Sequence, residues 1–150
     1  MKKTTFVLFL VFILAFSAKA QVVITVADNA TLEIKNGATL NAGGLELIPD
    51  YDYTINGPNH IERDLTAISI DGVDSMARHY EMAEDLTVYE GSIVYNYDDA
   101  DMNGITHFAA LQILDTSGGS WMNYADEDSA DYTVTHAFAA AVQIKAVTAN

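Results

Sequence analysis

The sequence contains no cysteine. A disulfide framework, a lipid-anchored amino terminus and cysteine-based catalysis are therefore all excluded. Without covalent cross-links, the folded state has to be stabilised by a packed hydrophobic core.

Basic residues are the second shortage. Seven Lys and Arg stand against 21 Asp and Glu, which gives a net charge of −14. Lys2, Lys3 and Lys19 lie in the first 20 residues, so a chain without that segment keeps four basic residues and a net charge of −17. Because long-range repulsion opposes binding to nucleic acid or to anionic lipid, we expect neither partner.

Long hydrophobic runs are missing after residue 20. The one long run, Phe6–Phe16, follows two lysines and precedes Ser17-Ala18-Lys19-Ala20. Its 11 residues are too few for a membrane span, which needs about 17 to 25. A charged start, a short apolar run and small residues at the end are typical of a secretory signal peptide, cleaved here before Gln21. We therefore expect residues 1–20 to be removed, no membrane insertion of the mature chain, and a secreted or cell-surface location.

The mature chain is dominated by short β-strand patterns. In residues 21–59, strand-like pieces alternate with turn-formers, and Asn36-Gly37 is a strong signal for a tight hairpin. Ala30-Thr31-Leu32 returns as Ala38-Thr39-Leu40, which is consistent with stacked hairpins or one coil of a β-solenoid. Asn56-Gly57-Pro58-Asn59 marks a break. We therefore expect a β-rich N-terminal segment, residues 21–59, packed on a second domain.

Residues 60–150 predict an all-β fold, a β-sandwich. Alternation supports this fold, because Leu111 and Ile113 share one face of a strand, as do Val142 and Ile144. The best helical candidate, Ser75–Asp85, lacks helical spacing and is interpreted as strand or loop. The expected strands are 60–64, 67–70, 76–80, 91–97, 110–114, 121–124, 132–138 and 141–147.

The richest stretch for function is Gly91–Gly104, where a strand with Ile93, Tyr95 and Tyr97 on its core face enters an acidic turn. The order Asp99-x-Asp101-x-Asn103-Gly104 matches the first half of a calcium loop. The second half fails, because Ala110 stands where a bidentate glutamate is needed. Our preferred prediction is an acidic turn. The alternative is a calcium site with Asp99, Asp101 and Asn103 as its ligands. The acidic segment Asp126–Asp131 could add oxygen ligands.

Other chemistries find little support. His60, His79, His107 and His136 show no metal spacing, so zinc is not expected. No serine has a nucleophile-elbow motif around it, and the many carboxylates allow only a general hypothesis of glycoside hydrolysis. Trp121, the one tryptophan, is expected in the core rather than as a platform for a sugar ring.

The chain contains, in this order, the phrases ATLEIKNGATLNAGGLELIPDYDYTINGPNHIERD, EGSIVYNYDDADMNG, ALQILDTSGGSWMNY and VQIKAVTAN. Taken together, they resemble a module of secreted surface proteins of the Bacteroidetes, of the adhesin-like kind exported by type nine secretion. The resemblance implies a non-enzymatic structural or adhesive module without catalytic residues, whose partners are other surface proteins or extracellular glycans. Such proteins commonly continue into a C-terminal sorting domain, whereas this sequence stops at Asn150, so we expect a fragment or a periplasmic protein. The alternatives are a calcium-assisted carbohydrate-binding module and, as a weaker hypothesis, a glycoside hydrolase.

The signal peptide gives the first testable prediction. Mass spectrometry of the exported protein should show a chain that starts at Gln21, since the small residues Ala18 and Ala20 precede that bond. Recovery of the full-length form alone, in the cytoplasm, would refute the export prediction.

Overall fold

The computed structural model describes residues 21–106, 110–128, 130 and 132–150, and within these ranges every regular element is a β-strand. No helix that could cross a membrane occurs among them. The all-β prediction is confirmed. The strands are β1 (Gln21–Val26), β2 (Thr31–Ile34), β3 (Leu40–Ala42), β4 (Leu45–Pro49), β5 (Tyr53–Asn56), β6 (Asn59–Asp64), β7 (Ser69–Ile70), β8 (Val73–Asp74), β9 (His79–Asn96), β10 (Ala110–Asp115), β11 (Ser120–Ala125) and β12 (Thr133–Ala149).

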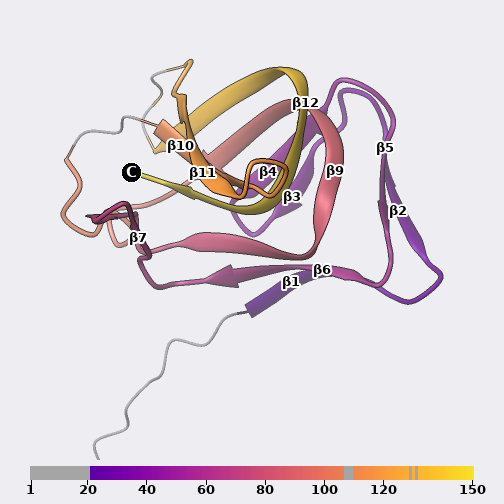
Figure 1. Cartoon of the computed structure of the whole chain (residues 1–150), viewed down its shortest axis with the longest axis horizontal. Helices are drawn as coiled ribbons and strands as arrows, with labels where there is room; N and C mark the ends of the chain where they lie inside the picture. Colours follow the sequence, from indigo (N-terminus) through magenta and orange to yellow (C-terminus); the bar gives the residue numbers. More distant parts are fainter. Residues whose placement is uncertain (1–20, 107–109, 129, 131) are drawn as a thin grey trace, which may run out of the picture.

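Two long strands, β9 and β12, form the centre of the molecule (Figure 1). They pair antiparallel from Thr133 opposite Asn96 to Val147 opposite Tyr80, with register shifts in between. The first part of β9 also pairs with β6, and its last part pairs with β4. The eight-stranded sheet therefore has two halves: β1-β6-β9-β12-β10-β11 on one side of the bend and β3-β4-β9-β12 on the other.

The two halves pack face to face as in a sandwich. Tyr80 and Tyr95 belong to the same strand, and on a straight strand they would lie about 50 Å apart at roughly 3.3 Å per residue. Their ring centroids are instead 6.0 Å apart, at an interplanar angle of 86°. The strand therefore folds back on itself, and the buried side chains fill the space between its two arms.

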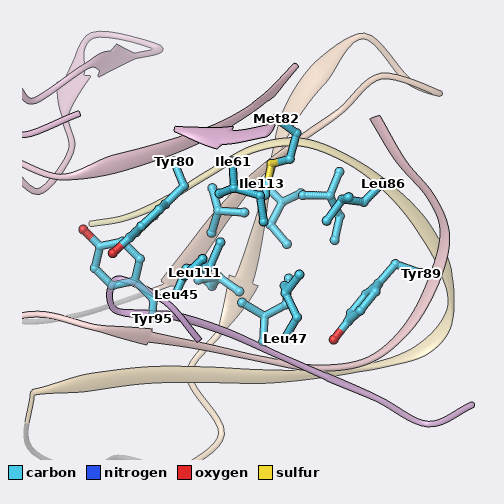
Figure 2. Packing of buried hydrophobic residues seen from close by; sticks show 14 of the residues in the cluster. Leu45, Leu47, Ile61, Tyr80, Met82, Leu86, Tyr89, Tyr95, Leu111 and Ile113 are labelled. Atoms are coloured by element: carbon cyan, nitrogen blue, oxygen red, sulfur yellow. The ribbon is translucent and has the colours of Figure 1, made fainter. Parts of the chain in front are cut away.

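Figure 2 shows this core, with tyrosines at its two ends and aliphatic side chains between them. Tyr80, Tyr89 and Tyr95 are each fully buried. Each hydroxyl donates to a backbone carbonyl: Tyr80 to Gly43 at 2.8 Å, Tyr95 to Arg78 at 2.8 Å and Tyr89 to Ser92 at 2.7 Å. Because an unpaired buried hydroxyl is costly, these bonds allow large aromatic rings to fill the core.

The N-terminal strands belong to the same structure. β1 pairs with β6, and β3 and β4 extend the sheet from β9. The predicted boundary between residues 59 and 60 falls inside β6, directly after its first residue, Asn59. A separate two-stranded sheet, β2 with β5, covers one side of the bend (Figure 1).

The prediction of a tight hairpin at Asn36-Gly37 is wrong. Strand β2 pairs with β5, and β3 pairs with β4. The tight hairpin lies instead at Gly43-Gly44, where both residues have positive φ and Ala42 faces Leu45. A two-residue turn with two positive φ angles matches the twist of the flanking strands, and two glycines meet that demand without a steric cost.

Alternation placed the core faces correctly. Ile93, Tyr95 and Tyr97 are buried, and so are Leu111 and Ile113. The strand boundaries around the bend were wrong. The segments expected at 76–80 and 91–97 both overlap one strand, His79–Asn96, and those expected at 132–138 and 141–147 both overlap another, Thr133–Ala149.

Gly91 lies at the bend of β9, with φ 138. A Cβ atom there would stand 2.3 Å from the Ile48 carbonyl oxygen and 2.6 Å from the Pro49 Cα. Only glycine allows β4 to pack this closely against the bend. Gly37, with φ 71, has nothing within 4 Å of the corresponding position and is a matched control.

We expect Gly91→Ala to lower the free energy of unfolding by about 3 kcal/mol, because overpacking adds to the cost of a positive φ. Gly37→Ala should cost about 1 kcal/mol, the conformational cost alone. Urea unfolding of both variants measures the difference. Equal losses would show that β4 does not pack on Gly91 as described.

Candidate functional site

The predicted acidic turn follows β9 directly, and Asp101 is its buried member, with 4% of its surface exposed. Its Oδ2 accepts a hydrogen bond from the Asp98 amide at 2.9 Å and lies 2.7 Å from Nη2 of Arg78. The Arg78 side chain is largely buried, and its Nη1 donates to the Asn96 carbonyl at 3.0 Å. An ion pair with these additional bonds closes the turn onto the end of β9.

The other two predicted calcium ligands have separate partners. Asp99 accepts a hydrogen bond from the Tyr132 hydroxyl at 3.1 Å, and Asn103 donates its amide to the Ser75 carbonyl at 3.0 Å. Asn103 has φ 47, a conformation that asparagine tolerates in turns. The structure therefore does not gather these three side chains around one point, and it favours the interpretation as a turn.

Metal ligands already in place are not found elsewhere either. Among the residues that the structure describes, no three His, Cys, Asp or Glu side chains are gathered in a geometry that would hold an ion. The acidic segment after β11 is fastened to β12: Asp126 accepts from the Thr135 amide at 2.9 Å, and Glu127 accepts from the Ala137 amide at 3.1 Å. Asp131 and His107 lie outside the described residues.

Trp121 does not occupy the core as the sequence predicted. It lies half-buried on β11, which is an edge strand paired only with β10 in the part of the chain that the structure describes. Its neighbour Met122 is 46% exposed. The core is filled by tyrosine, leucine and isoleucine instead, so the expectation that the largest aromatic ring must be buried was wrong.

A surface groove of about 380 Å³ opens beside the bend of β9. A second hollow of about 230 Å³, between Tyr53–Asn59 and Glu84–Thr87, shares Tyr53 with it. The groove lies between the end of β4, the start of β5 and the bend itself. Its lining residues are Pro49, Tyr51, Asp52, Tyr53, Val88 and Glu90.

Tyr53 forms the fixed wall between the two hollows. Its ring packs edge-on against Tyr89 with centroids 5.2 Å apart, and its hydroxyl donates to the Thr87 carbonyl at 3.1 Å. Burial raises the pKa of Tyr53 to about 12, so the hydroxyl stays protonated and keeps its donor role at physiological pH. The ring is therefore held in one orientation.

Two side chains stand out from the groove. Tyr51 is 67% exposed and Val88 is 68% exposed. Val88 also has φ 55, which is rare for a β-branched residue because its side chain crowds the backbone. Strained backbone of this kind persists where the surrounding structure determines it, and it is concentrated at functional sites.

Carboxylates stand at the rim of the groove. Asp52 is bound by Nζ of Lys35 at 2.8 Å and by the Asn36 amide at 3.0 Å. These bonds, the one from Lys35 first, hold the pKa of Asp52 below its ordinary value. Asp52 therefore presents ionised oxygens that accept hydrogen bonds, and Glu90 lines the same groove.

The sequence contained one signal for this groove, the concentration of tyrosine at Tyr51, Tyr53 and Tyr89. The fold was needed to bring residues 49–53 beside residues 88–90. Comparison of the chain with protein-family models, with curated proteins and with solved structures gave no match. The assignment of function therefore rests on the geometry of the site.

The Arg78–Asp101 pair gives a test of the calcium prediction. We expect Asp101→Asn to lower the free energy of unfolding by about 3 kcal/mol, because it removes the near counter-charge of a buried guanidinium and leaves only the exposed Asp98 carboxylate at 3.8 Å. The loss should be equal in millimolar calcium and in chelator. Asp99→Asn, at an exposed position, should cost less than about 1 kcal/mol. A melting temperature that rises in calcium, with a rise that Asp101→Asn removes, would establish the calcium site instead.

Proposed function

We propose that this protein is a non-enzymatic extracellular module, of a structural or adhesive kind, which binds a neutral glycan in the groove beside the bend of β9. The observation that carries the proposal is the pairing of a largely exposed aromatic ring, Tyr51, with a fixed one, Tyr53, in one open groove rimmed by Asp52 and Glu90. Secretion or display at the cell surface belongs to the same proposal and rests on the signal-peptide pattern.

The chemistry of the groove suits a sugar. A pyranose ring has an apolar face that packs on a tyrosine ring, and hydroxyl groups around its edge that donate to carboxylate oxygens. The exposed methyl groups of Val88 add apolar surface at the groove, while Asp52 is already ionised and oriented by Lys35. The ligand would therefore contact apolar surface at its face and acceptors at its edge.

Charge selects among glycans. The chain has a net charge of −14, and two carboxylates line the groove itself. A sulfated or uronic-acid-rich glycan would be repelled over distances of about 8 Å at physiological salt. A neutral glycan avoids this repulsion, so we propose that class of ligand.

Two features support binding without catalysis. A glycosidase needs a carboxylic acid whose pKa is raised so that it can protonate the leaving group. At Asp52 the bonds from Lys35 and the Asn36 amide lower the pKa. The groove is also open on the surface rather than enclosed around a bond to be broken, which suits recognition of a glycan along its length.

A glycan array containing neutral and acidic glycans, probed with the purified protein in calcium and in chelator, tests the proposal. We expect binding to neutral glycans in both conditions, and about a tenfold loss of affinity in Tyr51→Ala because the stacking surface is removed. Leu65→Ala, which removes a side chain 46% exposed between β6 and β7, should bind as the wild type does.

Three outcomes would count against the proposal. They are no binding to any neutral glycan, preference for acidic glycans, and equal affinity of Tyr51→Ala and wild type. Binding that appears only in calcium would favour the calcium-assisted carbohydrate-binding module. Release of reducing sugar from a bound glycan would favour the hydrolase.

A further inference from the structure

The outer face of β6 and β9 gathers residues of the types that bind metal ions. Side chains alternate along a strand, so His60, Glu62 and Asp64 of β6 share one face. In β9, His79 and Glu81 share the matching face, because Glu62 pairs with Glu81 and Asp64 pairs with His79. Side chains directly opposite each other on antiparallel strands have Cβ atoms about 5 Å apart. Two separate sequence segments thus place three carboxylates and two imidazoles on one small patch.

His79 is the unusual member of this patch. It lies on the outer face, yet only 6% of it is exposed. Its Nδ1 is 3.0 Å from the Thr66 carbonyl oxygen. A carbonyl can only accept, so Nδ1 carries a proton, and in a neutral ring Nε2 then carries the lone pair. Metal-binding histidines are oriented in this way, with the second nitrogen donating to a backbone carbonyl.

Nε2 of His79 faces the carboxylates. It lies 3.7 Å from Oε1 of Glu81, beyond hydrogen-bond distance. A hollow of about 100 Å³ lies next to it, lined by Glu62, Asp64, His79 and Glu81. At the neighbouring position, Nε2 of His60 lies 3.8 Å from Oε2 of Glu62. A nine-tenths buried imidazole therefore presents its acceptor nitrogen to a hollow otherwise lined by carboxylates.

We propose that this patch binds a divalent transition-metal ion, with Nε2 of His79 and the carboxylates of Glu62, Asp64 and Glu81 as ligands. Three carboxylates on two paired strands repel one another, and a cation among them removes that repulsion. The imidazole selects the kind of cation, because Zn²⁺ and related ions accept nitrogen ligands whereas Ca²⁺ and Mg²⁺ prefer oxygen.

The ligand atoms are not yet gathered around one point in the structure. A tetrahedral ion with bonds of about 2.0 to 2.1 Å holds neighbouring ligand atoms roughly 3.4 Å apart. The His79–Glu81 separation of 3.7 Å is close to that value. The side chains of Glu81 and Glu62 are 62% and 33% exposed, so both can rotate toward the hollow without disturbing the core. His79 is the member that is already fixed.

The sequence contained the signal for this patch, in His60-x-Glu62-x-Asp64 and His79-x-Glu81. A search for closely spaced pairs of histidine overlooks it, because the spacing of ligands on strands is two, and the second half of the set comes from another strand. This site is independent of the glycan groove, which lies at the bend of β9.

Isothermal titration and thermal unfolding of the purified protein with ZnCl₂ test the proposal. We expect one Zn²⁺ bound per chain and a melting temperature raised by about 5 °C at saturation, since an ion that binds the native state stabilises it. CaCl₂ and MgCl₂ at equal concentration should give no comparable rise. Glu81→Gln, at an exposed side chain, should fold normally and weaken Zn²⁺ binding tenfold or more, and His79→Gln should weaken it further.

The matched control is His136→Gln. His136 of β12 also has a glutamate beside it, with Nδ1 3.2 Å from Oε1 of Glu127, but its cross-strand partner on β9 is Ile93 and not a carboxylate. This variant should bind Zn²⁺ as the wild type does. No heat of binding in wild type, unchanged affinity in Glu81→Gln, or loss of binding in His136→Gln would each overturn the proposal.

Discussion

The pairing of β9 with β12 is the interaction on which the rest of the structure depends. It is the only pair, among the strands described, that runs through both halves of the sheet. β6 and β4 attach to opposite ends of β9, and β10 attaches to β12. The core is the space between the two arms of this ribbon, so the bend that brings the arms together determines what each strand covers. The groove beside Val88 and the metal patch beside His79 are both consequences of how β9 is flanked.

Much of this fold follows from local pattern. Alternation identified the buried faces of Gly91–Tyr97 and Ala110–Leu114, because a strand with one face in the core needs an apolar side chain at every second position. The continuity of β9 was not predictable in the same way. Val88 and Gly91 have positive φ and interrupt the alternation where the strand turns through the bend. A prediction from local alternation therefore places the end of a strand at such a bend. The hairpin at Asn36-Gly37 failed for a related reason, since partner choice depends on strands far along the chain.

The candidate sites also differ in how far they could be predicted from the sequence. Spacing alone predicted calcium ligands around Asp101, but Arg78, the residue directly before β9, pairs with that carboxylate beyond the far end of the strand. No local rule could supply this partner. The groove could not be predicted without the fold either, because its lining residues come from two separate segments. Tyr51 follows β4, and Val88 lies at the bend of β9. Trp121 shows that size does not decide burial when tyrosine hydroxyls find backbone acceptors inside the core. Only the patch at His79 could have been found from alternation together with a correct guess that β6 pairs with β9.

The central position of β12 has a consequence for the order in which the chain folds. Tyr80 and Val147 are neighbours in the sheet although they lie far apart in the sequence, and closing such long loops makes folding slow. Each arm of β9 has one neighbouring strand, β6 or β4, and only β12 supplies the second neighbour. The strands before it can form hairpins such as β3–β4, but a lone two-stranded hairpin is only marginally stable in water. The central ribbon of β9 and β12 is therefore completed only when the C-terminal strand is available, and β10 and β11 join the rest of the sheet only through that strand.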